Sequence, residues 1–73
     1  MKLSRLKDLR EDKDLSQEEL CKIIGYKQQT YSCYETGTRT LPYELLIELA
    51  NFYNTSTDYI LGRTNEVKPY PKM

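Results

Sequence analysis

Hydrophobic residues recur at helical spacing in five short stretches of this chain, and polar residues, glycine or proline separate one stretch from the next. In the first stretch, Leu3, Leu6 and Leu9 follow one another at steps of three, and Arg10 lies one position further on. Spacing of three to four residues is typical of a helix with one apolar face. The pattern predicts an all-α chain with helices over residues 2–13, 17–24 and 28–35, from Pro42 to a break at 54–56, and over 57–61.

The stretch from Ser16 to Gly37 is the most informative part of the sequence. Ser16 and Glu19 have the spacing of a capping box, in which each side chain accepts a hydrogen bond from the other residue's backbone amide. Gly25 follows the last apolar residue of this helix and predicts its end, because many helices end at a glycine in the left-handed conformation. Gly37 predicts the end of the next helix in the same way. Two helices joined by a three-residue turn that contains glycine form a helix-turn-helix arrangement, which implies sequence-specific DNA binding.

The length of 73 residues is that of one small domain. We expect a compact five-helix domain over residues 1–63 and a flexible C-terminal tail over 64–73. The sequence contains neither a run of 18 apolar residues nor a charged leader with an apolar core. We therefore expect a cytoplasmic protein without a membrane partner.

Charge and residue types narrow the function further. Eleven basic and eleven acidic residues give a net charge of zero, whereas a nucleic-acid-binding protein typically has a basic face. Binding to DNA would then depend on the placement of a few cations, and its salt-sensitive part would be modest. With no histidine and two cysteines, the chain has no metal-ligand spacing and no catalytic constellation. We expect no enzyme activity, no cofactor and no metal, and reduced thiols.

Four polar or small side chains lie on one side of the predicted helix over 28–35, and they are the candidates for contact with DNA bases: Gln28, Gln29, Ser32 and Cys33. The two glutamines open the helix, and docked helix-turn-helix proteins place the N-terminal residues of this helix against base edges. A glutamine amide also matches the donor and acceptor groups of adenine. The alternative is an ordinary solvated helix face.

Contacts with the DNA backbone are predicted on either side of these residues. Gln17 lies in the first turn of a helix, where free amides favour a phosphate. Lys27 precedes the next helix at a position where a hydroxyl or carboxylate side chain is the better cap. Arg39 lies in a polar loop between Thr38 and Thr40. Ordinary solvated side chains are the alternative at each position.

Arg10 and Glu35 are predicted to pair and to orient the second helix of the motif. We expect a surface pair, worth about 1 kcal/mol at most, so that its role is to orient more than to stabilise. Two unconnected surface charges are the alternative.

These motifs resemble the lambda-repressor-like, Xre/Cro-type helix-turn-helix family from about Leu3 to Arg63. The segments that carry the resemblance are LSQEEL (15–20), Gly25, SCYETG (32–37), Pro42 and ELANFYNTSTDYILGRT (48–64). The resemblance implies a five-helix domain that binds operator DNA as a dimer. It implies base contacts at the four positions given above, backbone contacts at Gln17, Lys27 and the 38–40 loop, and a clasp between Arg10 and Glu35. Lys27 and Cys33 depart from the residue types that are common at their positions in the family.

The expected function is a transcriptional regulator, most simply a repressor, that binds a pseudo-palindromic double-stranded operator. We expect a homodimer, formed in solution or only on DNA, with Tyr59, Ile60 and Leu61 as candidate contacts. The alternative from another class is an antitoxin-like or anti-repressor module whose helical surface binds a protein partner. A third hypothesis is a regulator whose DNA affinity is switched by oxidation of Cys33.

Overall fold

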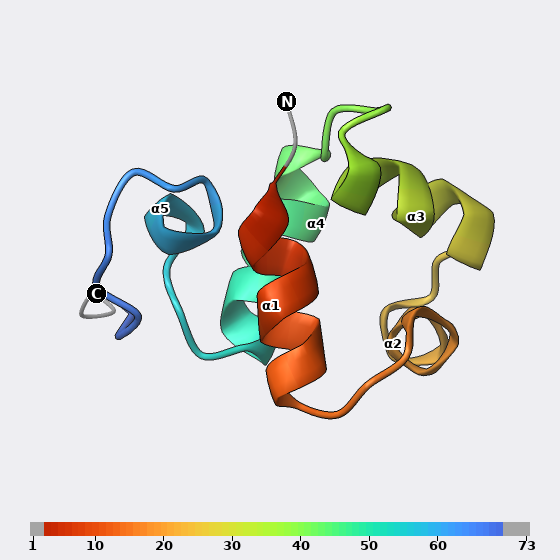
Figure 1. Ribbon diagram of the computed structural model, residues 1–73, viewed down its shortest axis with the longest axis horizontal. Coiled ribbons are helices and arrows are strands. Elements are labelled where there is room, and N and C mark those ends of the chain that lie inside the picture. Colours follow the sequence, from red (N-terminus) through yellow and green to blue (C-terminus); the bar gives the residue numbers. More distant parts are fainter. Residues whose placement is uncertain (1–2, 70–73) are drawn as a thin grey trace. The chain divides into compact units, whose positions relative to one another are not determined.

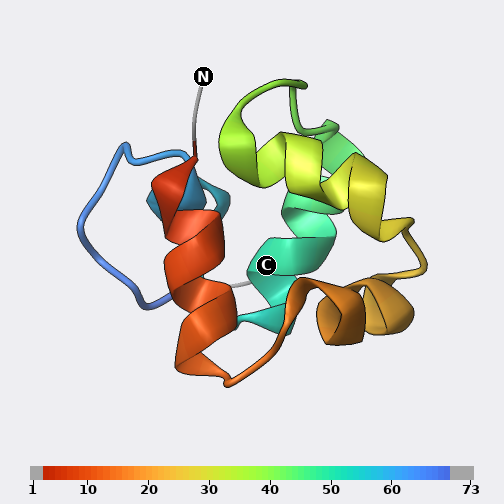
Figure 2. The ribbon, with the colours of Figure 1, turned by 45° about the vertical axis from the view of Figure 1, so that its right-hand side comes forward.

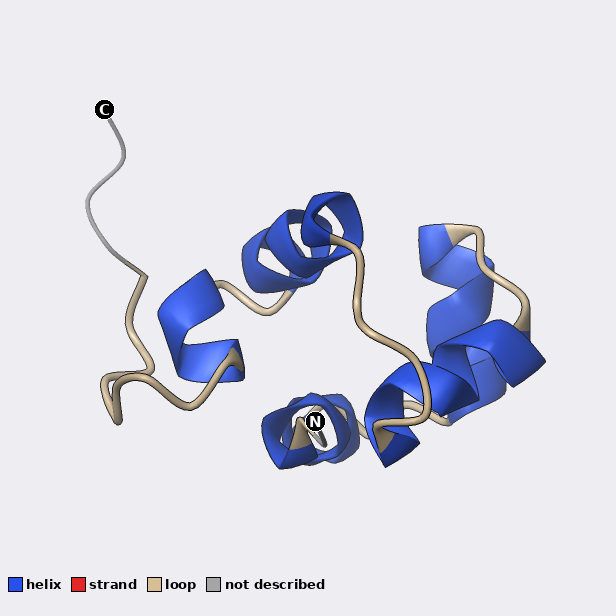
Figure 3. Ribbon diagram, turned by 90° about the horizontal axis from the view of Figure 1, so that it is seen from above, coloured by secondary structure: helices blue, strands red, loops and turns tan. Residues whose placement is uncertain are grey.

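The computed structural model describes residues 3–69, which form helices and loops without strands (Figures 1 and 3). The helices are α1 (Ser4–Asp12), α2 (Gln17–Ile24), α3 (Gln28–Thr36), α4 (Tyr43–Phe52) and α5 (Thr57–Ile60). The predicted all-α architecture of five helices is confirmed. Contacts between Cα atoms divide the chain into two compact units, one ending at Thr40 and the other beginning at Leu41. None of the helices in residues 3–69 has the length and apolar character to cross a bilayer.

Helix α1 buries a stripe of Leu3, Leu6 and Arg10 in the first unit. Steps of three and four follow the 3.6-residue turn of a helix, so Arg10 takes the inward position and Leu9 is only half-buried. The helix begins at Ser4, and Lys2, the predicted first residue, lies outside the described residues.

The helix-turn-helix of the first unit is built from α2 and α3, which a short turn joins (Figure 2). Both halves of the capping box are present: the Ser16 hydroxyl accepts from the Glu19 amide at 3.1 Å, and the Glu19 carboxylate accepts from the Ser16 amide at 2.9 Å. Gly25 ends α2 with φ of 74°, and its amide donates to the Cys21 carbonyl at 2.9 Å. Gly37 ends α3 with φ of 84°. The predicted boundaries of the motif are therefore confirmed, with α3 one residue longer than expected.

Helix α3 packs against both α1 and α2. The buried side chains at the α2 and α3 side of this core are Leu20, Cys21, Ile24, Tyr31 and Tyr34. Burial raises the pKa of the Cys21 thiol, as suits a small apolar side chain in a helix contact. The helical spacing of Leu20, Ile23 and Ile24 predicts that all three lie on one inward stripe of α2. Ile23 is 55% exposed, so this prediction is wrong for Ile23.

In the second unit, α4 packs against α5. Pro42 is the N-cap of α4 with extended backbone angles, so the helix begins one residue after the proline. The buried stripe of α4 consists of Leu45, Leu49 and Ala50. The spacing of Leu46, Leu49 and Ala50 predicts an inward stripe that includes Leu46. Leu45 is buried in its place and Leu46 is half-buried, because both lie in an unbroken Leu-Leu-Ile run that spacing alone does not resolve.

Helix α5 is a single turn held at both ends by hydrogen bonds. The Ser56 hydroxyl caps the helix by accepting from the Tyr59 amide at 3.0 Å, and the Arg63 amide donates to the Asp58 carbonyl at 2.8 Å. Further along, the Thr55 hydroxyl donates to the carbonyl of Val67, within the segment expected to be a flexible tail. The extent of the domain and of the tail remains a prediction, and residues 70–73 of that tail lie outside the described residues.

Candidate nucleic-acid interface

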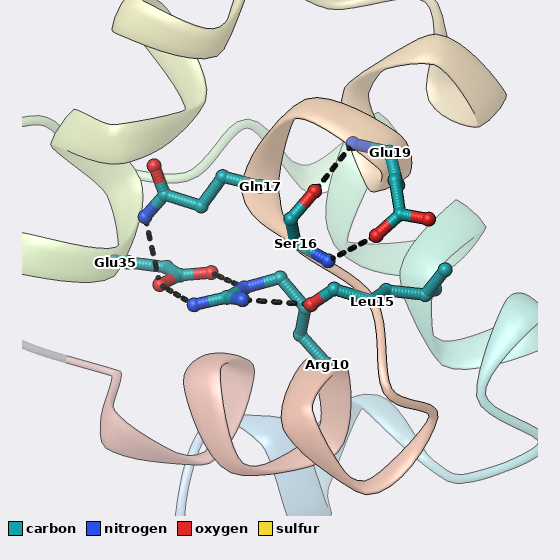
Figure 4. Close-up of polar contacts among 6 residues, drawn as sticks. All are labelled: Arg10, Leu15, Ser16, Gln17, Glu19 and Glu35. Carbon is teal, nitrogen blue, oxygen red and sulfur yellow. Dashed lines mark hydrogen bonds and ion pairs between the residues drawn. The ribbon is translucent and has the colours of Figure 1, made fainter.

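The predicted pair of Arg10 and Glu35 is a two-pronged clasp between α1 and α3 (Figure 4). Arg10 Nε donates to Glu35 Oε2 at 2.8 Å, and Arg10 Nη2 donates to Glu35 Oε1 at 3.2 Å. Two parallel N–H···O bonds fix the plane of the carboxylate against that of the guanidinium. The clasp therefore fixes one end of α3 against α1.

Two further contacts, which sequence reasoning missed, extend the clasp to the start of α2. The third guanidinium nitrogen, Nη1 of Arg10, donates to the Leu15 carbonyl at 2.8 Å. The side-chain amide of Gln17 donates to Glu35 Oε1 at 3.1 Å (Figure 4). Arg10 and Glu35 thus connect α1, the loop before α2, the first turn of α2 and the last turn of α3. One feature of the sequence indicated that Arg10 faces the interior: the inward stripe of α1 continues from Leu6 to Arg10.

The expectation of a surface pair was wrong, because both residues are buried, with exposures of 8% for Arg10 and 6% for Glu35. Loss of one partner would leave a buried charge without its counter-ion, which costs about 3–5 kcal/mol, well above the cost at a surface pair. We therefore predict that the clasp stabilises the fold, in addition to its predicted role of orienting α3.

Electrostatics keep this pair ionised. Burial alone would raise the pKa of Glu35, but interactions with Arg10, the Tyr31 hydroxyl and Gln17 outweigh it and lower that pKa. The hydrogen bond to Glu35 raises the pKa of Arg10. Glu35 is therefore a carboxylate, able only to accept hydrogen bonds, and its Gln17 partner must present the amide nitrogen.

The first turns of α2 and α3 border an open depression of about 470 Å³ in the first unit. Its lining residues are all polar: Gln17, Gln28, Gln29 and Ser32. Gln28 and Gln29 are exposed, and Ser32 and Cys33 are half-buried. The structure thus brings three of the four candidate base-reading residues together with one candidate backbone contact, and Cys33 is not among the lining residues.

The N-terminus of α3 has no side-chain cap. Lys27 occupies the N-cap position with extended backbone angles, and its carbonyl accepts the first helical bond, from Tyr31, at 3.0 Å. The amides of the first turn lack a side-chain acceptor, and the exposed Lys27 stands beside them. This combination suits an anionic group such as a phosphate.

The loop after α3 presents hydroxyl groups and one cation. Thr36 donates to the Cys33 carbonyl at 3.3 Å, and its hydroxyl lies 3.0 Å from that of Thr38. The Arg39 amide donates to the same Cys33 carbonyl at 3.2 Å, which ties the loop to the helix. Thr38, Arg39 and Thr40 are all exposed, as a contact with the DNA backbone requires.

One of the three candidate dimer contacts at α5 was wrong, because its side chain is buried. Ile60 is 1% exposed and belongs to the core, so its side chain has no surface to offer a second subunit. Tyr59 and Leu61 are half-buried. Of the three candidates, Tyr59 and Leu61 therefore keep side-chain surface for a contact between subunits.

Several known proteins are similar to this chain in sequence. Residues 6–60 match the family described as helix-turn-helix. The regulator YobD of Bacillus subtilis is 38% identical over 69 residues, which cover 94% of this chain and 62% of the relative. The cryptic phage CTXphi transcriptional repressor RstR of Vibrio cholerae is 44% identical over 50 residues, or 68% of this chain and 45% of the relative.

Antitoxin PezA of Streptococcus pneumoniae is 33% identical over 64 residues, which cover 88% of this chain and 40% of the relative. The chain spans about three fifths or less of the length of these curated relatives. No solved structure matches it. The family match and the similarity to YobD lead to one assignment: the chain, with its five helices, belongs to the lambda-repressor-like, Xre-type helix-turn-helix family.

Proposed function

We propose that the chain is a sequence-specific DNA-binding transcriptional regulator, a repressor of a bacterial or phage operator, and that α3 enters the major groove. The observation that carries this proposal is the polar depression at the first turns of α2 and α3, where Gln28, Gln29 and Ser32 are free of the core. A recognition helix packs one side against the core and leaves polar residues of its N-terminal turn exposed to the DNA, as α3 does.

In this proposal the glutamines read bases and the surrounding residues hold phosphates. The amides of Gln28 and Gln29 each offer a donor and an acceptor, which match N7 and N6 of adenine. Ser32 and Cys33 lie a turn deeper along α3, and Cys33 offers an apolar surface to a thymine methyl group. Lys27 lies at the uncapped N-terminus of α3 and holds a phosphate there.

The backbone contacts on the other side come from Gln17 and the loop of Thr38, Arg39 and Thr40. Gln17 keeps one amide hydrogen and its first-turn backbone amide for a phosphate, since Glu35 uses the other side-chain hydrogen. The clasp of Arg10 and Glu35 holds α3 at its angle to α1 and α2, so that both sets of contacts are made together.

Two copies would bind the two halves of a pseudo-palindromic operator, with recognition helices in successive major grooves about 34 Å apart. Tyr59 and Leu61, both half-buried, are the candidates for pairing that keep exposed surface. Two half-buried side chains make a small contact, so we propose a dimer that forms mainly on DNA.

The test is an unbiased selection of double-stranded DNA by the purified chain at physiological salt. We expect a palindromic motif whose half-sites lose their adenine preference when Gln28 and Gln29 are replaced by alanine. The matched control is Asn51→Ala, an exposed polar residue of α4, which should select the same motif as the wild type. Identical motifs from all three proteins would refute base reading by these glutamines.

Absence of any enriched motif would favour a second function, a protein-interaction module of the antitoxin or anti-repressor type. The net charge of zero and the similarity to a protein named antitoxin PezA support this alternative. Tight capture of one partner protein together with a shallow, sequence-independent affinity for DNA would establish it.

A further inference from the structure

The loop that joins the two compact units presents three threonines within five residues, Thr36, Thr38 and Thr40, with Arg39 between the last two. They differ in their hydrogen bonds. Thr36 ends α3 and donates its hydroxyl hydrogen to the Cys33 carbonyl, so the contact with Thr38 requires Thr38 to be the donor. Within residues 3–69, the Thr40 hydroxyl has no hydrogen bond.

Thr40 also has the surroundings of an accessible substrate. It is exposed, lies outside any helix, and is the last residue of the first unit, so a short segment around it can extend without breaking a helix. Arg39 precedes it, is exposed, and has no ion pair in the described part of the chain. An arginine adjacent to a hydroxyl residue can pair with a phosphate placed on that residue.

The proposed DNA surface carries so little charge that one added phosphate would change its net charge strongly. Among the nine proposed DNA contacts, only Lys27 and Arg39 are cationic, and none is acidic. A phosphothreonine carries about −1.5 to −2 charges at neutral pH. One phosphate on this loop would therefore offset the positive charge of both cations. By pairing with Arg39, it would also keep that arginine from contacting the DNA.

We propose that Thr40 is a phosphorylation site for a protein threonine kinase and that its phosphorylation releases the operator. The Thr40 hydroxyl oxygen attacks the γ-phosphorus of ATP, the bond from that phosphorus to ADP breaks, and the hydroxyl proton passes to the base of the kinase. This inference rests on the proposed DNA-binding function, because the phosphate acts by opposing contacts with DNA phosphates.

The first experiment tests access to Thr40. The full chain and a free peptide of residues 36–41 are incubated with ATP and a bacterial threonine kinase chosen because it phosphorylates the peptide at the position of Thr40. We expect one phosphoryl group on the full chain, mapped to Thr40 by fragment mass spectrometry. Modification of the peptide together with an unmodified Thr40 in the folded chain would overturn the proposal.

The second experiment measures binding to the operator obtained by selection. Chain carrying genetically encoded phosphothreonine at position 40 should bind at least about tenfold more weakly than the unmodified chain at physiological salt. The control is the same phosphothreonine chain after treatment with a phosphatase, which regenerates the Thr40 hydroxyl and should bring the affinity back to within about twofold of the wild type. Unchanged circular dichroism and melting temperature in the phosphorylated chain separate this loss from unfolding.

The two proposals fail in different ways. A wild-type chain that selects no DNA overturns the proposed function, and this inference with it. A wild-type chain that binds its operator while the phosphorylated chain binds within twofold of it overturns the phosphorylation switch alone.

Discussion

Replacing Glu35 with glutamine would change the charge of the clasp while keeping its shape. In the wild-type protein, Oε2 accepts from Arg10 Nε, and Oε1 accepts from Arg10 Nη2 and Gln17 Nε2. A glutamine amide has one oxygen for these three donors, so its NH₂ group must face at least one of them. The buried guanidinium would also lose its counter-ion.

The size of this effect follows from burial. Removal of one partner from a buried ion pair costs about 3–5 kcal/mol. We expect the lower end, about 3 kcal/mol, because Arg10 keeps its bond to the Leu15 carbonyl and gains one amide acceptor. A domain of this length is stable by on the order of 5 kcal/mol. A loss of about 3 kcal/mol corresponds to a fall in melting temperature of about 12–24 °C.

The measurement is urea and thermal unfolding at neutral pH, followed by circular dichroism. The matched control is Glu18→Gln, which breaks an exposed pair on α2 between Glu18 and Lys22 at 3.7 Å, with side-chain exposures of 69% and 76%. We expect the control to lose less than about 0.5 kcal/mol. Equal losses in Glu35→Gln and Glu18→Gln would refute the claim that burial makes the clasp a stabilising element.

A double substitution separates loss of the pair from loss of packing. Arg10→Met alone leaves a buried carboxylate, and Glu35→Leu alone leaves a buried guanidinium. The two together replace the pair by apolar side chains, which typically restores most of the stability. Additive losses in this cycle would mean that Arg10 and Glu35 contribute through separate contacts.

The pH dependence provides a second readout of the same clasp. The folded-state pKa of Glu35 is lowered, so the unfolded chain takes up this proton first on acidification. The contribution of Glu35 is therefore complete above its unfolded pKa of about 4.3 and is lost as the pH falls through the lower folded-state pKa. The difference in unfolding free energy between the wild type and Glu35→Gln should shrink over this acidic range. A difference that stays constant with pH would contradict the ionised clasp.

Three further predictions concern the helix-turn-helix motif. Ser16→Ala removes one half of the capping box and should lower the unfolding free energy by about 1 kcal/mol in urea titrations, and an unchanged midpoint would show that the cap is dispensable. Gly25→Ala should cost about 1 kcal/mol in the same assay, because the positive φ strains an alanine while its Cβ meets no atom within 4 Å. A larger loss would indicate a clash. Gln28→Ala should cost about 1–3 kcal/mol on the selected operator in binding titrations and little on random DNA, whereas Lys27→Ala should weaken both and lower the salt slope by about 1.

The sequence predicted the helix-turn-helix closely because its boundaries depend on neighbouring residues. Ser16 and Glu19 are three positions apart, and the capping box needs nothing beyond the chain between them. Gly25 ends α2 through its own backbone freedom. The pattern of residues also predicted five helices and the pairing of Arg10 with Glu35, and the family resemblance implied both again.

The features that sequence reasoning misjudged depend on residues far apart in the chain. Glu35 is 25 positions from Arg10, so the spacing of residues does not reveal whether their pair is buried or exposed. The choice of Leu45 over Leu46 as the inward residue of α4 depends on what the helix packs against, and both fit a helical stripe. The hydrogen bond from Gln17 to Glu35 was missed for the same reason, because Glu35 lies on another helix.

Helix α3 owes its position to contacts on one side only, and this has a consequence for DNA recognition. It has no side-chain cap, no acidic residue in its first turn and no basic residue in its last turn, and helices this short are marginal on their own. Packing of Tyr31 and Tyr34 and the bonds to Glu35 must therefore hold it in place. The exposed side, with Gln28 and Gln29, makes no such contribution. Substitutions there should change the preferred DNA sequence at constant stability, while substitutions at Glu35 should destabilise the fold before they alter that preference.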